Sequence, residues 1–556
     1  MLRPEFLLYP PFTPAPALPA ATLLLLRDRA EGGWEVLMTR RAAAASFAPD
    51  MFVFPGGGVE PQDAQPGDEV YLPQSGVKPE LQAAVVAALR ETWEEMGVLL
   101  AVDAKAQPVQ PALVQSLDRT QPLWPQLRAL GLQLDARSVW QIGHFTAPPH
   151  LSKRFTVPFF VARMPHGQVA VPDDREQFEA VWVQPVQALQ AHRAQQMPMM
   201  LPTVRTLAYL APLPSAQAVL ERAAQGPMWE HAPRFVLEAG KEKSLLEHDA
   251  AYAEACMVAP DGQVGHDVAW QNEKPVALRK HVQRLTAPNP GVMTGPGTNS
   301  YVVGSRSTGF IVIDPGPADA AHVARLGAAT GGEVRHIVCT HSHPDHAPGA
   351  ALLQAWCESQ GKPKPLVYGL PSAPTAAPSS YFVPDVKLDD GMCVAVQGTE
   401  GSLQVTHTLQ AIFTPGHAAN HLCLLLKEDA LLFSGDHVLN GSTTIVDTPD
   451  GNMRDYIDSL DKLLAVCEQM QVEFLLPAHG HVLGQAAQVI HKLKSHRLAR
   501  EEKVLQAMRN QPSGSLADWV AQAYADTPEN LWPLAQRSLI AHVERIRELG
   551  LLDVTD

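Results

Sequence analysis

Four potential metal ligands lie within six residues at His341-Ser342-His343-Pro344-Asp345-His346, directly after a short apolar run at 336–339. Imidazole nitrogens and carboxylate oxygens are the ligands that borderline-soft divalent ions prefer. Residues two apart in an extended segment point the same way, so we expect the first two histidines to share one ion. Asp345 and His346 follow the turn at Pro344 and are expected to reach a second ion. Polar ligands at strand ends are typical of α/β enzymes.

Three later apolar runs also end in potential ligands. The run 411–413 leads to His417, the run 430–433 leads to Asp436, and the run 474–476 leads to His479. The chain has 22 histidines, so a chance cluster is conceivable. A cluster of four ligands in six residues, followed by three partners at strand ends, argues against chance. The pattern predicts a dinuclear metal site built from separate loops.

This ligand set resembles that of the metallo-β-lactamase superfamily, over about residues 280–485. The resemblance implies an αββα sandwich and assigns the ligands residue by residue. One metal would be held by His341, His343 and His417, the other by Asp345, His346 and His479, with Asp436 bridging the two.

Asp314, in Ile313-Asp314-Pro315-Gly316, matches the first motif of that family and is expected to support the ligands from behind. Where the family commonly has Gly-Gly after the histidine motif, this chain has Ala347-Pro348-Gly349, a departure in the loop and not in the ligands. We expect His421, His437 and His481 to be structural or surface residues.

The chemistry expected of such a site is hydrolysis. Two divalent ions, Zn²⁺ or else Mn²⁺ or Fe, lower the pKa of a bound water toward about 7 and clamp the attacked group. The substrate would be a phosphodiester, a thioester or another ester, with Asp345 and Asp436 as catalytic residues.

A second candidate site lies in Arg90-Glu91-Thr92-Trp93-Glu94-Glu95-Met96-Gly97, at the end of a predicted helix over 81–96. Glu91, Glu94 and Glu95 stand at i, i+3 and i+4, so they share one helix face. Such carboxylates repel one another unless a cation is bound, and hard oxygen ligands favour Mg²⁺ or Mn²⁺.

This segment resembles the helical half of the Nudix box, with the glycine half displaced to 56–58 by about twenty extra residues. The resemblance spans about 18–210 and is to a subfamily associated with coenzyme A diphosphatase activity. It implies an α/β/α sandwich, metal ligands Glu91, Glu94 and Glu95, a catalytic Glu94 and hydrolysis of a phosphoanhydride. Thr92 replaces the usual aliphatic residue, and Gln82 stands where a glutamate is usual. The alternative is a Nudix domain that binds ligands without catalysis.

We therefore expect a multidomain α/β protein. The expected parts are a Nudix domain over 1–211, an irregular linker over 212–279, a lactamase-like domain over 280–487, and a small winged-helix-like domain over 488–556. The last assignment depends on helices expected at 489–510, 515–524 and 528–549. A short strand is expected to start at 550–552. These helices, with Asn289-Pro290-Gly291 and Gly297-Thr298-Asn299, resemble a lactamase-like subfamily that includes single-strand-specific endoribonucleases.

The distribution of charge along the chain does not decide between a nucleic-acid substrate and a small-molecule substrate. The net charge of −15 argues against broad adhesion to nucleic acid or to anionic membranes. Between residues 491 and 510, however, six Lys/Arg stand against two Asp/Glu, a local charge of +4. Such a helix suits either single-stranded RNA or a solvated surface, and a small thioester is the alternative substrate. Six scattered cysteines and the lack of a signal-peptide pattern favour a cytoplasmic protein, whose oligomeric state the sequence leaves open.

Overall fold

The computed structural model describes residues 3–43, 48–67, 69–74, 78–175 and 177–552. These residues form two compact units. One unit is Thr13–Pro233, and the other joins Arg234–Asp556 to the N-terminal residues up to Phe12. Among the residues described, no helix has both the length and the apolar character needed to cross a membrane.

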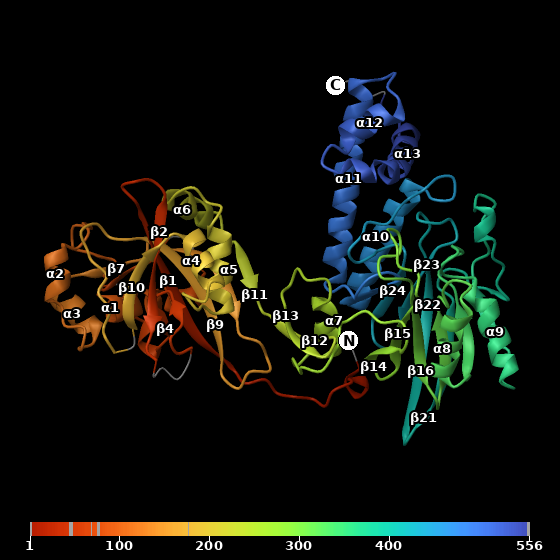
Figure 1. Cartoon of the computed structure of the whole chain (residues 1–556), viewed down its shortest axis with the longest axis horizontal. Coiled ribbons are helices and arrows are strands. Elements are labelled where there is room, and N and C mark those ends of the chain that lie inside the picture. Colours follow the sequence, from red (N-terminus) through yellow and green to blue (C-terminus); the bar gives the residue numbers. More distant parts are fainter. Residues whose placement is uncertain (1–2, 44–47, 68, 75–77, 176, 553–556) are drawn as a thin grey trace. The chain divides into compact units, whose positions relative to one another are not determined.

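The unit Thr13–Pro233 is built on a mixed sheet with the strand order β10-β2-β1-β9-β8-β11. Its central strand β1 contains the buried run Leu23–Leu26, as expected for a strand covered on both faces. The helix α1 covers one face, and α4, α5 and α6 cover the other (Figure 1). The sheet strands are β1 (Ala17–Asp28), β2 (Trp34–Arg41), β8 (Trp140–Thr146), β9 (Arg154–Arg163), β10 (Gln177–Val183) and β11 (Trp229–His231), with β3 (Phe52–Val53) on β2 and β4 (Gly56–Gly58) on β1. The helices are α1 (Pro79–Met96), α4 (Pro185–Arg193), α5 (Leu201–Leu210) and α6 (Ala216–Ala224).

The extra residues between the glycine run and α1 contribute ordered structure. They contain the short helix η2 (Pro61–Ala64) and the strand β5 (Tyr71–Leu72). β5 pairs with β7 (Gln133–Asp135), which also pairs with β6 (Ala101–Val102). The helices α2 (Pro111–Ser116) and α3 (Leu123–Leu130) lie between β6 and β7 in the chain. The insertion therefore builds a small second sheet without disturbing α1.

The segment 212–279, expected to be an irregular linker, is structured. α6 begins at Ser215, whose side chain accepts a hydrogen bond from the Ala218 amide, and β11 pairs with β8. Beyond Pro233 the chain forms the hairpin β12 (Arg234–Glu238) and β13 (Lys241–Leu245), then α7 (Tyr252–Val258) and β14 (Val276–Arg279). These elements have three to nine residues, so periodicity could not reveal them.

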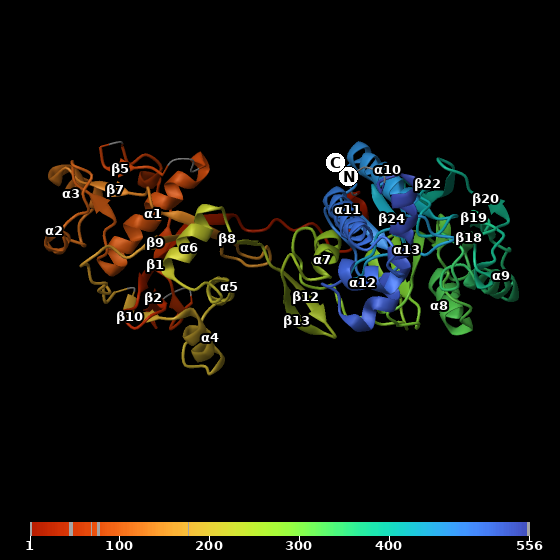
Figure 2. The ribbon, with the colours of Figure 1, turned by 90° about the horizontal axis from the view of Figure 1, so that it is seen from above.

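The second unit contains two sheets packed face to face with an apolar core between them. α8 and α9 cover the outside of the first sheet, and α10 and α11 cover the outside of the second (Figure 2). The first sheet runs β14, β15 (Val282–Thr286), β16 (Asn299–Ser305), β17 (Gly309–Ile313), β18 (Val334–Val338), β19 (Leu366–Gly369) and β20 (Val386–Lys387). The second runs β21 (Cys393–Glu400), β22 (Leu403–Phe413), β23 (Leu422–Leu426), β24 (Leu431–Gly435) and β25 (Phe474–Pro477). The four covering helices are α8 (Ala320–Thr330), α9 (Gly349–Ser359), α10 (Met453–Met470) and α11 (Ala486–Asn510).

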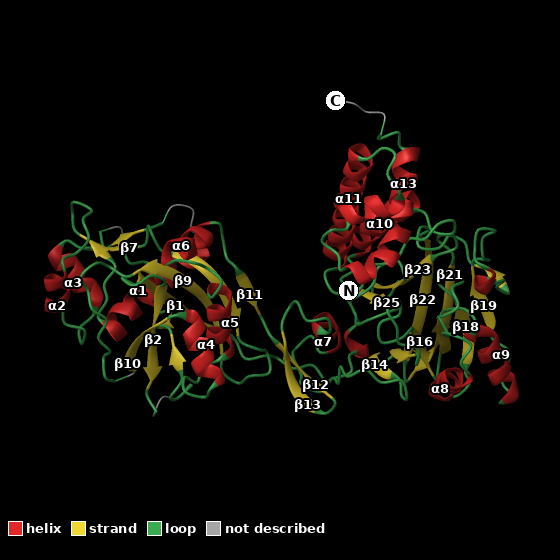
Figure 3. Ribbon diagram, turned by 45° about the horizontal axis from the view of Figure 1, so that its top comes forward, coloured by secondary structure: helices red, strands yellow, loops and turns green. Residues whose placement is uncertain are grey.

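The described C-terminal residues are helical (Figure 3). The far end of α11 packs with α12 (Leu516–Ala523) and α13 (Trp532–Glu548) around a small core of its own. α13 follows the short helix η4 (Glu529–Leu531). The strand expected to start at 550–552 is absent from this part of the structure, where Gly550 with its φ of +65° forms a turn.

The N-terminal residues are anchored in the second unit. Arg3 donates hydrogen bonds to both carboxylate oxygens of Asp429, at 3.1 and 2.6 Å, and Asp429 is fully buried. His281 donates to the same carboxylate at 2.8 Å, and the Arg279 guanidinium donates to the Arg3 carbonyl at 2.6 Å. We call residues 3–12 the N-terminal strap.

Replacing Arg3 by alanine is expected to destabilise the unit that contains Asp429. The buried carboxylate would lose its guanidinium and keep His281, a loss of about 1–3 kcal/mol. Calorimetry should show the transition of this unit at a lower temperature and that of the Thr13–Pro233 unit unchanged. Equal shifts of both transitions, or no shift, would contradict the anchoring role.

Candidate metal centres

The histidine-rich loop that follows β18 is held from behind by Asp314. Asp314 follows β17 directly, and β17 and β18 are parallel, so both loops leave the same edge of the sheet. The Asp314 carboxylate accepts hydrogen bonds from the Thr340 amide at 2.7 Å and the Thr340 hydroxyl at 2.8 Å. It also lies 3.1 Å from Nδ1 of His346. Asp314 therefore fixes both ends of the motif that contains His341 and His343.

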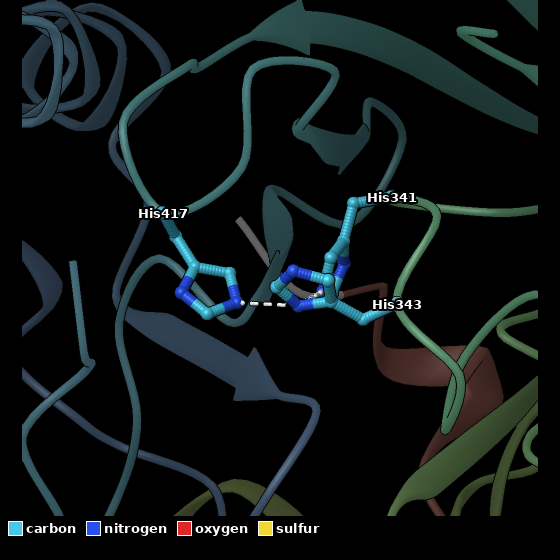
Figure 4. A group of neighbouring side chains, drawn as sticks. All are labelled: His341, His343 and His417. Carbon is cyan, nitrogen blue, oxygen red and sulfur yellow. Dashed lines mark hydrogen bonds between the residues drawn. The ribbon is translucent and has the colours of Figure 1, made fainter. Parts of the chain in front are cut away.

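Three histidine nitrogens converge in front of this loop (Figure 4). Nδ1 of His343 lies 3.0 Å from Nε2 of His341 and 3.0 Å from Nε2 of His417. Nitrogens at about 2.0–2.1 Å from a tetrahedral ion are about 3.3 Å apart, so the observed spacing is close to that of a ligand set. His417 lies in the loop after β22. The fold brings it to the motif although more than seventy residues separate the two in the sequence.

A second group of potential ligands lies beside the first. Oδ2 of Asp345 is 3.2 Å from Nε2 of His346 and 3.4 Å from Nε2 of His479, which follows β25. Asp345 accepts a hydrogen bond from the Thr298 hydroxyl at 3.0 Å, and Asn289 in turn bonds the Thr298 amide and hydroxyl. The motifs noted around Asn289 and Thr298 thus fix this carboxylate.

Asp436 lies between the two groups. Its Oδ2 is 3.5 Å from Nε2 of His417, whereas its Oδ1 is 3.3 Å from Nε2 of His479 and 3.6 Å from Nε2 of His346. Each carboxylate oxygen therefore faces a different group. The Asp436 amide donates to Nε2 of the buried His421 at 3.1 Å, which holds this residue at the end of β24.

The donor set fits divalent cations. Nδ1 of His417 lies 2.7 Å from the Ile445 carbonyl and Nδ1 of His479 lies 3.2 Å from the Gly297 carbonyl. A ring whose Nδ1–H donates to a carbonyl presents the lone pair of Nε2 to a metal. Nε2 of His346 and Oδ1 of Asp436 are buried and lack a hydrogen-bond partner among the described residues. Buried polar atoms without partners are costly, and a bound cation would satisfy both.

The charge balance differs between the two groups. Burial lowers the pKa of His343 to about 3, so this ring is neutral, as a metal ligand must be. Burial also opposes charge on His479, but the Asp436 carboxylate outweighs it and raises the pKa to about 10. The carboxylates of Asp345 and Asp436 likewise hold the pKa of His346 well above its ordinary value despite burial. Both rings therefore lie in the negative field of Asp345 and Asp436, which would also attract a cation.

A cavity of about 810 Å³ opens over the two groups. His343, His417 and Asp436 form part of its floor, and α11 and α13 contribute one wall. Its apolar lining residues are Val292, Met293, Pro344, Ala377, Leu439, Ile445, Pro449, Leu531, Leu534 and Ala535. An ester larger than a few atoms therefore has room to reach the site.

The acidic helix of the other unit is organised around Arg90. This residue is 2% exposed, and its guanidinium donates to both oxygens of the buried Asp63, at 2.9 and 3.0 Å. It also donates to Glu91 at 3.1 Å and to Glu94 at 2.8 Å. Asp63 from the insertion thus supplies Arg90 with a buried carboxylate.

Glu95 faces the glycine run. It accepts hydrogen bonds from the Gly56 amide at 2.9 Å and from the Gln177 side chain at 2.7 Å. Burial raises its pKa to about 8 against these two hydrogen bonds. A Cβ on Gly57 would lie 2.4 Å from the Glu91 carboxyl carbon, so the backbone of the glycine run approaches this carboxylate closely. The displaced glycine half thus packs on the acidic helix despite the insertion.

The structure brings together every residue that the sequence proposed for the first site: His341, His343, Asp345, His346, His417, Asp436 and His479. Glu91, Glu94 and Glu95 lie on one turn of α1, but among the described residues they form no close ligand group. Their carboxylates instead contact Arg90, Gly56 and Gln177. The sequence analysis missed Asp63 and Thr298, for which an acidic residue shortly after the glycines and the Gly297-Thr298-Asn299 motif were the available signals.

Comparison with known proteins decides the family of the second unit. Residues 293–479 match the Metallo-beta-lactamase superfamily model. The chain is 31% identical over 284 residues to the Beta-lactamase-like protein 2 homolog of Drosophila melanogaster, covering 50% of this chain and 91% of that protein. The chain belongs to the metallo-β-lactamase superfamily. Residues 515–556 match the Beta-lactamase associated winged helix domain and residues 17–203 match the NUDIX domain. The protein is a hydrolase that combines a Nudix domain, a metallo-β-lactamase domain and a winged helix domain.

Two further relatives match parts of the chain. The Thioesterase pkgB of Emericella nidulans is 33% identical over 226 residues, which cover 40% of this chain and 57% of that protein. A Nudix hydrolase structure from Alicyclobacillus acidocaldarius is 29% identical with a TM-score of 0.33, covering 37% of this chain and 96% of that one.

Proposed function

We propose that the metallo-β-lactamase domain is a dinuclear-metal thioesterase. The observation that carries this proposal is Asp436, whose two carboxylate oxygens face two different ligand groups below one cavity. His341, His343 and His417 would hold one ion, and Asp345, His346 and His479 the other. Two divalent ions at these groups, most simply Zn²⁺, would supply an activated water and polarise the attacked carbonyl.

The residues of this chain have separate tasks in such a reaction. Asp436 would fix the distance between the two groups, and Asp345, held by Thr298, would orient the nucleophile. The carbonyls behind His417 and His479 would keep their rings in the ligating tautomer. The apolar lining of the cavity would bind the acyl part of the substrate and exclude bulk water.

A thioester is favoured over single-stranded RNA because much of the basic character of α11 is engaged within the protein. Arg497 is buried and donates to the Thr444 carbonyl. Lys494 is paired with Asp461, and Arg500 and Lys503 share Asp526. These ion pairs reduce the local charge of +4 that motivated an RNA substrate. The similarity to the Thioesterase pkgB of Emericella nidulans supports the same choice.

The test is a substrate panel on the full chain loaded with Zn²⁺ or Mn²⁺. Acyl thioesters of coenzyme A and of shorter thiols should be hydrolysed. The released thiol is measured by its reaction with a chromogenic disulfide. Single-stranded RNA should be cleaved slowly or not at all. Efficient RNA cleavage without thiol release would reject the thioesterase proposal and restore the RNA alternative.

For the Nudix domain we propose hydrolysis of a phosphoanhydride in coenzyme A or a related nucleoside diphosphate derivative. The support is that Asp63, Arg90 and the glycine run hold Glu91, Glu94 and Glu95 on one face despite the insertion. Mg²⁺ or Mn²⁺ would neutralise the pyrophosphate charge. An acyl coenzyme A carries both a thioester and a pyrophosphate, so one class of metabolite contains a bond for each domain.

Replacing Glu94 by glutamine is expected to remove the pyrophosphohydrolase activity and to leave thioester hydrolysis unchanged. Glu94 is one-third exposed and hydrogen-bonded to Arg90, so the neutral isostere would lose metal affinity with little effect on folding. Product formation from coenzyme A, resolved by chromatography, measures the effect. Glu80→Gln, an exposed site in the first turn of the same helix, is the control. If the unaltered protein releases no phosphate-containing product, the domain is a binding module.

A further inference from the structure

The segment 234–279 contributes a buried carboxylate to the metallo-β-lactamase domain. Glu254 lies on α7, outside the residues matched by the family model, and its side chain is fully buried. It accepts two hydrogen bonds from the Arg284 guanidinium, at 2.5 and 3.1 Å. Two histidines also face it, His266 at 2.9 Å and His481 at 3.1 Å. Burial opposes its charge, yet Arg284 and these rings hold the pKa of Glu254 well below its ordinary value.

Two of the contacts of Glu254 are with the loop that contains His479. Besides the His481 ring, the amide of Val482 lies 3.3 Å from the same oxygen of Glu254. Trp270, also from the segment 234–279 (the accessory segment), packs against the His481 ring at a centroid distance of 4.2 Å. The accessory segment therefore holds the loop two and three residues beyond His479.

The same loop is also held by neutral groups. The Asn299 side chain donates to the carbonyls of Pro477 and Gly480, at 3.0 and 2.9 Å. The Tyr301 hydroxyl donates to the Pro477 carbonyl at 2.8 Å. Asn440 donates to the His481 carbonyl at 3.0 Å. These amide and hydroxyl contacts and the Glu254 carboxylate together hold the loop that contains His479.

We infer that Glu254 is a positioning residue for His479 and so for the ion held by Asp345, His346 and His479. A buried ion pair is a poor source of stability, because apolar residues of similar volume are often as stabilising. Glu254 also accepts from a ring and an amide of the ligand loop, which an apolar residue would leave without an acceptor. This inference rests on the proposed dinuclear site, and it predicts that the accessory segment controls the affinity of one ion and not of the other.

The test measures metal binding rather than turnover. Titration with Co²⁺, followed by its absorption bands, and competition of Zn²⁺ with a chromophoric chelator would give the affinity of each binding step. In Glu254→Gln, one ion should bind at least about 10-fold more weakly, the loss typical of a partner behind a ligand. The ion of His341, His343 and His417 should bind as before. Glu242→Gln, an exposed carboxylate on β13 of the same segment, is the matched control.

A double variant, Glu254→Leu with Arg284→Met, separates positioning from stability. It removes both buried charges together, so the fold should persist. Unfolding temperatures near that of the unaltered protein, with one weakened ion, would support the inference. Two ions bound as tightly as before would overturn it. Simultaneous loss of both ions and of the tertiary structure would also overturn it. Glu254 and its partners would then stabilise the domain and not position His479. Failure of the unaltered protein to bind two ions would instead reject the dinuclear site.

Discussion

Asp436→Asn is expected to abolish thioester hydrolysis by the metallo-β-lactamase domain. The substitution keeps the shape of the side chain but removes the charge that faces His417 on one side and His346 and His479 on the other. Partners one layer behind a metal ligand are worth about 10- to 100-fold. A carboxylate shared by both ligand groups should therefore cost more than about 100-fold in kcat/KM, with fewer than two ions retained after dialysis.

The measurements are steady-state thiol release and metal content on the same preparation. Asp458→Asn, an exposed carboxylate on α10, is the matched control and should behave as the unaltered protein. Activity of the Nudix domain on a pyrophosphate substrate reports that the variant is intact. Turnover within a few-fold of normal, with two ions still bound, would show that Asp436 does not join the two groups.

Asp63→Ala is expected to destabilise the Nudix domain strongly. Arg90 would stay buried at 2% exposure without its bidentate partner, and Glu91 and Glu94 would offset only part of the loss. Breaking a buried pair by removing one partner costs about 3–5 kcal/mol, and we expect the lower end here. For a unit of this size, that lowers Tm by roughly 6–12 °C. The Arg90 guanidinium would also be held less firmly, and with it the carboxylates of Glu91 and Glu94 that it contacts.

Calorimetry on the full chain measures this effect, because we expect the two compact units to unfold as separate transitions. The transition of the Nudix domain should shift and that of the metallo-β-lactamase unit should not. Glu69→Gln is the control within the same insertion, since Glu69 makes an exposed ion pair with Arg128. An unchanged Nudix transition in Asp63→Ala would mean that Arg90 finds another partner.

Much of the first site was predictable because each ligand follows a short buried strand. The expected runs at 430–433 and 474–476 correspond to β24 and β25, and the loops after them contain Asp436 and His479. Strands buried on both faces are near-continuous apolar runs, so their ends are visible in a sequence. Ligand identity and strand ends together were enough to predict which loops converge.

The buried charge clusters were not predictable. Glu254 and Asp63 lie in segments without clear periodicity, and their partners Arg284 and Arg90 lie 30 and 27 residues away. A carboxylate in such a segment looks like a solvated surface group until its neighbours in space are known. The same reason explains why 212–279 was expected to be a linker. The sequence also could not show that basic residues of α11 are paired within the protein. Pairs such as Lys494 with Asp461 depend on which helices are neighbours in space.

The N-terminal strap binds a part of the chain that is synthesised much later than the strap itself. Arg3 is made 426 residues before its partner Asp429, and the whole Nudix domain is made in between. A nascent chain can thus complete the Nudix domain while the strap still lacks its binding site. Closing a longer loop adds little entropy cost, since each doubling of length costs about 0.6 kcal/mol. The Nudix domain is consequently an insertion between two parts of one compact unit, and that unit is complete only when residues 3–12 have bound a segment made after the Nudix domain.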